Sequence, residues 1–185
     1  MRVIAGTARS LQLITPEGND TRPTTDRIKE TLFNMIQFDI PGCVFADLFA
    51  GSGAIGIEAL SRGASKAFFI ENEKKAINCI EDNLRHTKLM DKAVVLKQDA
   101  VMALQYSIHE PVDIVFADPP YQKGFAEMIL GAAKASKAVT EDTILIMEAA
   151  KEEDFSFSSD YGFEMIKEKV YKTNKHIFLE KDEMS

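Results

Sequence analysis

Three glycines at a fixed spacing stand between a predicted strand and a predicted helix. They occupy positions 51, 53 and 56, after the apolar run 44–49 and before the helical residues 57–60. Glycines in this context form a tight turn that lets a ligand come close to the backbone. Glu71 stands 20 positions after Gly51, at the end of the next predicted strand, where a carboxylate accepts hydrogen bonds from ribose hydroxyls. The pattern predicts a nucleoside-binding loop; the alternative is that the glycines only shape the strand-to-helix turn.

Acidic residues near this loop indicate which nucleoside ligand it binds. Asp47, four positions before Gly51, would repel the pyrophosphate of a nicotinamide dinucleotide. S-adenosyl-L-methionine has no phosphate and carries an ammonium and a sulfonium group, so we expect it as the cofactor. Glu71 and Asn72 would then hold the ribose, and Asp99 would either accept from the adenine amino group or cap a helix. The predicted cofactor-binding residues are Asp47, Phe49, Ala50, Gly51, Ser52, Gly53, Gly56, Glu71, Asn72, Asp99 and Ala100.

A second candidate site is the run Asp118-Pro119-Pro120-Tyr121, which follows the apolar stretch 112–117. The prolines alone could end the strand, because neither donates to a ladder. The acid and the aromatic beside them fit methylation of an amine on a base. The Asp118 carboxylate and the Pro119 carbonyl would accept from the two N–H bonds of that amine, and Tyr121 would stack on the base. We expect catalysis to depend on Asp118, Pro119, Pro120 and Tyr121, without a metal ion.

Strands that alternate with helices are expected to position these residues. About seven strands are predicted, from apolar runs at 44–49, 66–70, 93–96, 112–117, 143–147, 163–170 and 176–179. Helical spacing between them, clearest at 72–88 and 125–135, predicts right-handed crossovers and a mostly parallel sheet. The last two runs are separated only by 171–175, which predicts a closing antiparallel hairpin. We therefore expect an α/β, Rossmann-like fold that binds its ligand at the carboxyl edge of the sheet.

The first 42 residues are predicted to form an extension that packs on a core of residues 43–185, within a single structural domain. Residues 2–14 alternate loosely between apolar and polar types, which indicates a small β-ribbon. A helix is predicted over 27–38, with Thr24, Thr25 or Asp26 as its N-cap.

The composition is that of an ordinary globular chain. Its 185 residues carry 22 Lys and Arg against 29 Asp and Glu, a net charge of −7, which argues against a general nucleic-acid coat. Two cysteines and the lack of a long apolar run predict a cytoplasmic protein that does not enter a membrane. The three histidines show no paired spacing for metal or triad chemistry, so we expect them to be structural.

The glycine loop and the Asp-Pro-Pro-Tyr run resemble those of the bacterial 16S rRNA guanine-N2 methyltransferase family, RsmD. The resemblance rests on Asp47-x-Phe-Ala-Gly-Ser-Gly-x-x-Gly-x-Glu-Ala and on Asp118-Pro-Pro-Tyr. The leading segment is similar too, with Ile4-Ala-Gly and Arg22-Pro-Thr-Thr-Asp-Arg27. Other methyltransferases of this motif class often carry Asn in place of Asp118.

This resemblance implies a class I S-adenosylmethionine-dependent enzyme that methylates the exocyclic N2 amine of one guanine in small-subunit rRNA. Its partner would be 16S rRNA within the small ribosomal subunit or an assembly intermediate, with ribosomal proteins contributing to recognition. Arg22, Thr24 and Arg27 would border the cofactor and target-base pocket. Independently of the resemblance, the positive charges of Lys123 and Arg22 fit contacts to phosphates near the target base; the alternative for Lys123 is a solvated surface position.

Three other functions remain open at this point. The same chemistry could act on DNA adenine or on a protein glutamine, although the chain is too short to hold a target-recognition domain. A nicotinamide-dependent oxidoreductase is disfavoured by Asp47 and by the lack of a recognisable Tyr/Lys or His constellation. A ribosome-assembly factor that keeps a cofactor pocket without catalysis would be unaffected by Asp118→Ala.

Overall fold

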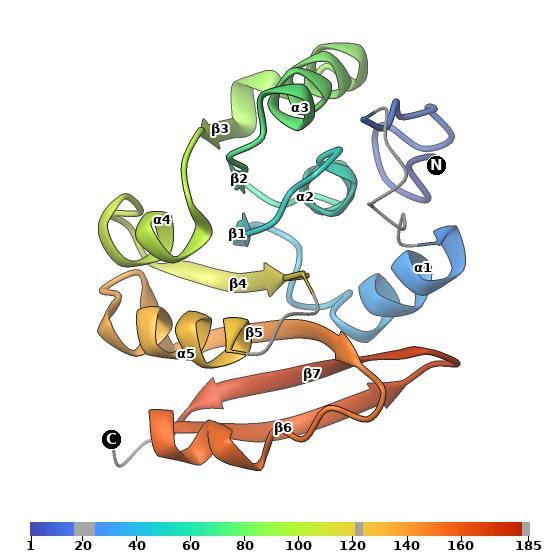
Figure 1. Cartoon of the computed structure of the whole chain (residues 1–185). Coiled ribbons are helices and arrows are strands. Elements are labelled where there is room, and N and C mark those ends of the chain that lie inside the picture. The colour runs from blue at the N-terminus through green and yellow to red at the C-terminus, as the bar shows by residue number, and fades with distance from the viewer. Residues whose placement is uncertain (17–24, 121–123, 183–185) are drawn as a thin grey trace. The chain divides into compact units, whose positions relative to one another are not determined.

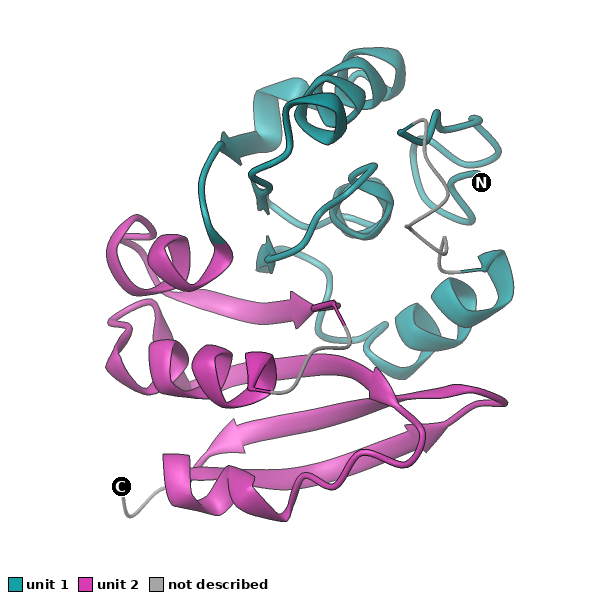
Figure 2. Ribbon diagram, in the orientation of Figure 1, with its two compact units in different colours: residues 1–99 teal, residues 100–185 magenta. Residues whose placement is uncertain are grey.

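A computed structural model of the chain describes residues 1–16, 25–120 and 124–182. The chain forms two compact units, Met1–Asp99 and Ala100–Ser185, coloured separately in Figure 2. Each unit contributes its own strands to the fold.

The first unit contributes three parallel strands, with helices between them along the chain (Figure 1). The strands β1 (Val44–Asp47), β2 (Lys66–Ile70) and β3 (Ala93–Leu96) lie in the order β3-β2-β1. Helix α2 (Ala54–Ser61) connects β1 to β2, and α3 (Lys74–Thr87) with a 3-10 turn, η1 (Met90–Lys92), connects β2 to β3. Both connections are the βα crossovers that parallel strands require.

The second unit combines one parallel pair with an antiparallel hairpin. Strand β4 (Val112–Ala117) pairs in parallel with β5 (Val139–Ala150), and α4 (Ala100–Tyr106) and α5 (Phe125–Ala135) pack against each other. Strand β7 (Asn174–Lys181) runs antiparallel between β5 and β6 (Phe163–Val170), and a 3-10 turn, η2 (Ser156–Tyr161), precedes β6. The described residues thus hold seven strands, mostly in parallel pairs, with a C-terminal hairpin. This confirms the predicted α/β class.

The N-terminal segment of the first unit lies against its helices. Residues 2–14 form a compact turn with a single antiparallel bridge, Arg2 to Gln12, so the predicted β-ribbon is reduced to one bridge. Helix α1 covers Asp26–Met35 and is capped by Thr25, whose Oγ1 accepts from the backbone N–H of Ile28 at 3.3 Å. Of the three candidate caps, Thr25 is therefore the one used. The division into 1–42 and 43–185 stays a prediction.

Apolar residues fill both units, and the two cysteines, Cys43 and Cys79, are buried and not joined by a disulfide. Within the described ranges, no helix is both long enough and apolar enough to cross a membrane.

Candidate functional site

The glycine loop begins where β1 ends and leads into α2. The backbone N–H of Ala50 donates to the Ile70 carbonyl at 3.0 Å, and that of Gly53 donates to the Ala50 carbonyl at 2.6 Å. Gly53 is the N-cap of α2 and has a left-handed φ of +78°, which a residue with a Cβ atom rarely adopts. The loop is thus a tight turn between strand and helix, as the glycine spacing predicts.

Glu71 is fixed beside this loop by three backbone hydrogen bonds. Its Oε2 accepts from the N–H of Gly51 at 3.0 Å, and its Oε1 accepts from the N–H groups of Asn72 and Glu73, each at 2.9 Å. The residue directly follows β2 and is partly exposed. A half-exposed carboxylate held in one orientation is suited to accept hydrogen bonds from a ligand that lies over the loop.

Asp47, the last residue of β1, contacts the same loop through its carboxylate. It is 1% exposed, and its Oδ2 accepts from the N–H of Gly56 at 3.1 Å. Burial raises the pKa of Asp47 to about 7; the Gly56 hydrogen bond opposes this shift, and the nearby negative charge of Glu71 adds to it. Two carboxylates therefore meet at the loop, and a cation there would stabilise their ionised forms.

Gly56 lets α2 approach β2 closely. A Cβ atom at this position would overlap the ring of Phe69 on β2. At Gly51, in contrast, a Cβ atom would enter open space, so the absence of a side chain leaves room above the loop. The two glycines therefore differ: Gly56 allows close helix packing, whereas Gly51 borders open space.

The remaining predicted cofactor residues flank the loop in the chain or follow the next strand. Phe49 and Ser52 are half-exposed, Ala50 is buried and Asn72 is exposed. The Ser52 carbonyl accepts from Nδ2 of Asn83, a buried α3 residue that the sequence analysis did not single out. Asp99 is exposed after β3, and Ala100 is the first residue of α4 in the second unit.

In the second unit, the turn at 118–120 begins immediately after β4. Asp118 is half-exposed, Pro119 is buried and Pro120 is exposed. Ala117, at the end of β4, pairs with Met147 on β5, so the register continued by one residue sets Asp118 opposite Glu148. The predicted Tyr121, Lys123, Arg22 and Thr24 lie outside the described residues. Arg27 is exposed on α1 in the first unit.

A buried polar cluster that the sequence analysis missed lies beside this turn. Glu148 Oε1 accepts from Asn174 Nδ2 at 2.6 Å, and its Oε2 lies 3.1 Å from Nε2 of His176, which is completely buried. The hydroxyl of Tyr171 lies 3.1 Å from Nδ1 of the same imidazole. The available signal was a polar residue directly beside an apolar run, namely Glu148 after 144–147 on β5 and His176 before 177–179 on β7.

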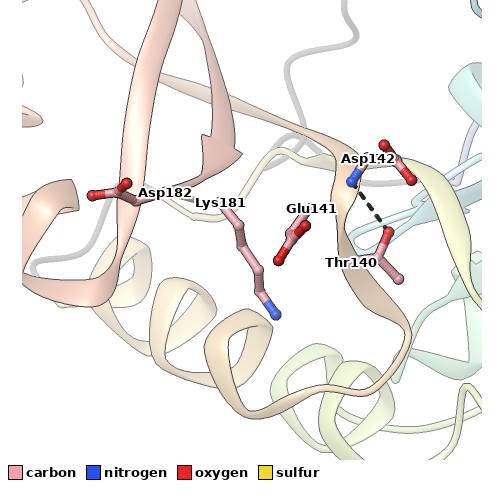
Figure 3. A pocket seen from close by; sticks show the side chains of 5 residues that line it. All are labelled: Thr140, Glu141, Asp142, Lys181 and Asp182. Carbon is pink, nitrogen blue, oxygen red and sulfur yellow. Dashed lines mark hydrogen bonds between the residues drawn. The ribbon is translucent and has the colours of Figure 1, made fainter. Parts of the chain in front are cut away.

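A cavity of about 330 Å³ lies at the opposite ends of the second unit's strands (Figure 3). Thr140, Glu141, Asp142, Lys181 and Asp182 line it, where β5 begins and β7 ends. Burial lowers the pKa of Lys181, and its Nζ donates to the Val139 carbonyl at 2.7 Å. This cavity and Asp118 lie at opposite ends of the strands, because Val112 at the start of β4 pairs with Val139, whereas Asp118 follows the end of β4. Among the described residues, no group of three or more His, Cys, Asp and Glu side chains could hold a metal ion.

Comparison with known proteins places these features in context. Residues 1–180 match the family described as Conserved hypothetical protein 95. The chain is 34% identical to "Ribosomal RNA small subunit methyltransferase D" of Haemophilus influenzae over 172 residues, which is 92% of this chain and 88% of that protein. The protein of the same name from Escherichia coli is also 34% identical, over 82% of this chain and 76% of its own. A solved structure of yhhF from Escherichia coli, described as a candidate methyltransferase, superposes with a TM-score of 0.84 at 31% identity and covers 98% of both chains.

Proposed function

We propose, from the premise that the chain belongs to the Conserved hypothetical protein 95 family, that it methylates the N2 amine of a guanine in small-subunit rRNA. The methyl donor would be S-adenosyl-L-methionine. The acceptor class is supported by the relatives named as small-subunit rRNA methyltransferases, and the guanine N2 position by the resemblance at Asp118-Pro-Pro-Tyr.

The pair of carboxylates at the glycine loop is the observation that carries the proposed cofactor. Asp47 is buried with a pKa of about 7, and part of that shift comes from the charge of Glu71. A pyrophosphate would add negative charge to this pair, whereas the sulfonium and ammonium groups of S-adenosylmethionine would offset it. When bound, S-adenosylmethionine supplies an electrophilic methyl group. Glu71 would hold the ribose, and Gly51 would leave room for the ligand above the backbone.

Asp118 and Pro119 would act on the target amine. The lone pair of an exocyclic amine is delocalised into the ring, so the nitrogen is a weak nucleophile. Acceptors at its two N–H bonds, the Asp118 carboxylate and the Pro119 carbonyl, would turn the lone pair toward the methyl group and stabilise the positive charge that develops on nitrogen. As the nitrogen gains the methyl carbon, the bond from that carbon to sulfur would break and leave the neutral thioether S-adenosylhomocysteine, and the nitrogen would give up one proton, which Asp118 would accept.

The proposal is tested by transfer of radiolabelled methyl groups to small ribosomal subunits that lack their own modification, with naked rRNA assayed alongside. After nucleoside digestion we expect the label in N2-methylguanosine. Asp118→Ala is expected to lose nearly all turnover while its affinity for S-adenosylmethionine stays within twofold of wild type. Label in DNA adenine or in protein, with none in rRNA, would replace the proposed acceptor.

A further inference from the structure

The polar cluster consists of the buried Glu148, Asn174 and His176, on β5 and β7, and the half-buried Tyr171 just before β7. Glu148 is on β5 and His176 is opposite it on β7, in register. The His176 imidazole also packs edge-to-face on the ring of Phe116 at 5.9 Å between centroids, and Phe116 is two residues before Asp118 on β4. One fully buried imidazole thus contacts β4 through its ring and β5 through its Nε2.

Glu148 and the two prolines share a wall of one small cavity. Pro119, Pro120, Glu148 and Phe155 are among the residues that line a space of about 10 Å³, which is no larger than a single water molecule. The carboxylate therefore has little freedom relative to the turn. Its two oxygens are each bound by a separate strand residue, Asn174 at 2.6 Å and His176 at 3.1 Å.

Burying such a cluster costs free energy of desolvation, so stability alone does not account for it. Well-packed apolar residues of similar volume usually stabilise a core at least as well as buried polar groups. The polar cluster does provide a fixed geometry, because each group is oriented by the next. With Glu148 as acceptor, His176 donates from Nε2 and its Nδ1 accepts from Tyr171. Burial raises the pKa of Tyr171 to about 12, so its hydroxyl remains a donor at neutral pH.

We propose that Glu148 is a positioning residue for the target amine: through its hydrogen bonds to His176 and Asn174 it holds the Asp118–Pro120 turn in the orientation that methyl transfer requires. This inference rests on the proposed function of Asp118. A reacting group displaced by about 1 Å costs up to about 100-fold in rate, so a loosened turn affects turnover more than binding.

Three variants separate positioning from a purely structural role. Glu148→Ala is expected to lower kcat about 10- to 100-fold, with KM for the ribosomal particle and affinity for S-adenosylmethionine within twofold of wild type. Glu148→Gln keeps one acceptor and one donor, and a change of His176 tautomer restores both hydrogen bonds, so kcat should recover to within about threefold. Glu153→Ala removes another acid from the wall of the same cavity and should leave kcat within twofold of wild type.

Hydrogen exchange supplies a readout that does not depend on activity. In Glu148→Ala the backbone amides of 115–118 should exchange at least fivefold faster than in wild type, and in Glu148→Gln they should not. Tyr171→Phe removes a single hydroxyl at the edge of the cluster. It tests the same series of hydrogen bonds if Glu148→Ala does not fold, and we expect kcat to fall about two- to fivefold.

Several results would overturn the positioning role. One is an unchanged kcat in Glu148→Ala, or in Tyr171→Phe where Glu148→Ala does not fold. A second is an equal loss of kcat in Glu148→Gln and Glu148→Ala. A third is unchanged exchange of the 115–118 amides in Glu148→Ala. A wild-type protein that methylates no rRNA would instead refute the proposed function, and the exchange data would still decide whether Glu148 holds the turn.

Discussion

At the scale of single residues, the contact between Gly56 and Phe69 sets how closely α2 approaches β2. Gly56→Ala places a methyl group on the Phe69 ring, and such overpacking costs about 1–3 kcal/mol of the free energy of unfolding. Displacing the start of α2 should also weaken S-adenosylmethionine binding at least tenfold, because the Gly56 N–H there donates a hydrogen bond to Asp47. Urea unfolding and calorimetric titration measure the two effects.

A second helical glycine gives a matched control for that substitution. Gly131 is in α5, and a Cβ atom there would meet nothing closer than 3.8 Å. Gly131→Ala should therefore leave stability unchanged or raise it by up to about 1 kcal/mol. Equal effects of the two substitutions would show that the Phe69 contact is unimportant.

The buried carboxyl of Asp47 makes stability depend on pH. Its pKa of about 7 in the folded chain exceeds the ordinary value of 3.8, so the folded state holds a proton that the unfolded chain has released. Stability from this group is therefore fully present below pH ~4 and is lost as pH rises through about 7. Asp47→Asn removes this dependence. Relative to wild type, the variant should gain up to about 4 kcal/mol between pH 4 and pH 8.

Urea unfolding of wild type and Asp47→Asn at several pH values measures this gain, with the exposed Asp91→Asn as the control that should show none. A difference in unfolding free energy that stays constant with pH would mean that Asp47 titrates normally. Because a bound cation favours the ionised carboxylate, S-adenosylmethionine affinity of wild type should rise as pH increases through 7.

At the scale of elements, Glu58 of α2 ties the N-terminal segment and α1 to the glycine-loop helix. It is fully buried and accepts from the N–H groups of Ile4 and Ala5, from Lys29 at 3.2 Å and from Arg62 at 2.8 Å. Glu58→Ala leaves the fully buried Lys29 without its countercharge, which should cost about 3–5 kcal/mol in the free energy of unfolding.

An exposed ion pair on α3 is the natural comparison for that loss. Arg85 pairs with Glu81 and Asp82, but 60% of its side chain is exposed, so Arg85→Ala should cost less than about 1 kcal/mol. Chemical denaturation of both variants measures the difference. If the free energy of unfolding of Glu58→Ala were within 1 kcal/mol of that of wild type, the contacts of Glu58 would not be what attaches the N-terminal segment.

The elements were largely predictable because apolar periodicity reports burial directly. The runs 66–70, 93–96, 112–117 and 163–170 coincide with strands, whereas β5 extends well beyond the expected 143–147. Buried polar residues escaped prediction for the opposite reason. Lys29 and His176 have charged or polar side chains that usually face solvent, and only tertiary partners such as Glu58 and Glu148 make their burial favourable.

The candidate site was predictable in its parts and not in its internal bonding. The spacing of Gly51, Gly56 and Glu71 identifies the loop, because the turn itself needs those residue types. That Glu71 binds the Gly51 N–H, and that Asp47 binds Gly56 while fully desolvated, depends on side-chain orientations that a sequence pattern does not contain. Local geometry follows from residue type, and the electrostatics follow from packing.

At the scale of the whole molecule, the net negative charge comes from one part of the chain. Residues 1–99 carry 13 basic and 13 acidic side chains, whereas residues 100–185 carry 9 basic and 16 acidic ones. Affinity for a phosphate backbone comes mainly from Lys and Arg. The electroneutral first unit is therefore the more favourable surface for rRNA, and a chain with a net charge of −7 should bind naked rRNA weakly.

Arg27 allows this expectation to be tested, because it is an exposed cation on α1 of the first unit. Arg27→Gln should raise KM for the ribosomal particle about three- to tenfold and leave kcat within twofold of wild type. If Arg27 contacts a phosphate, the slope of log affinity against log salt should also become shallower by about 1. Lys169→Gln removes another exposed cation, from β6 of the acidic second unit, and should change neither quantity. The reverse pattern, with the effect at Lys169, would place the rRNA on the acidic half and would require ribosomal proteins to supply the attraction.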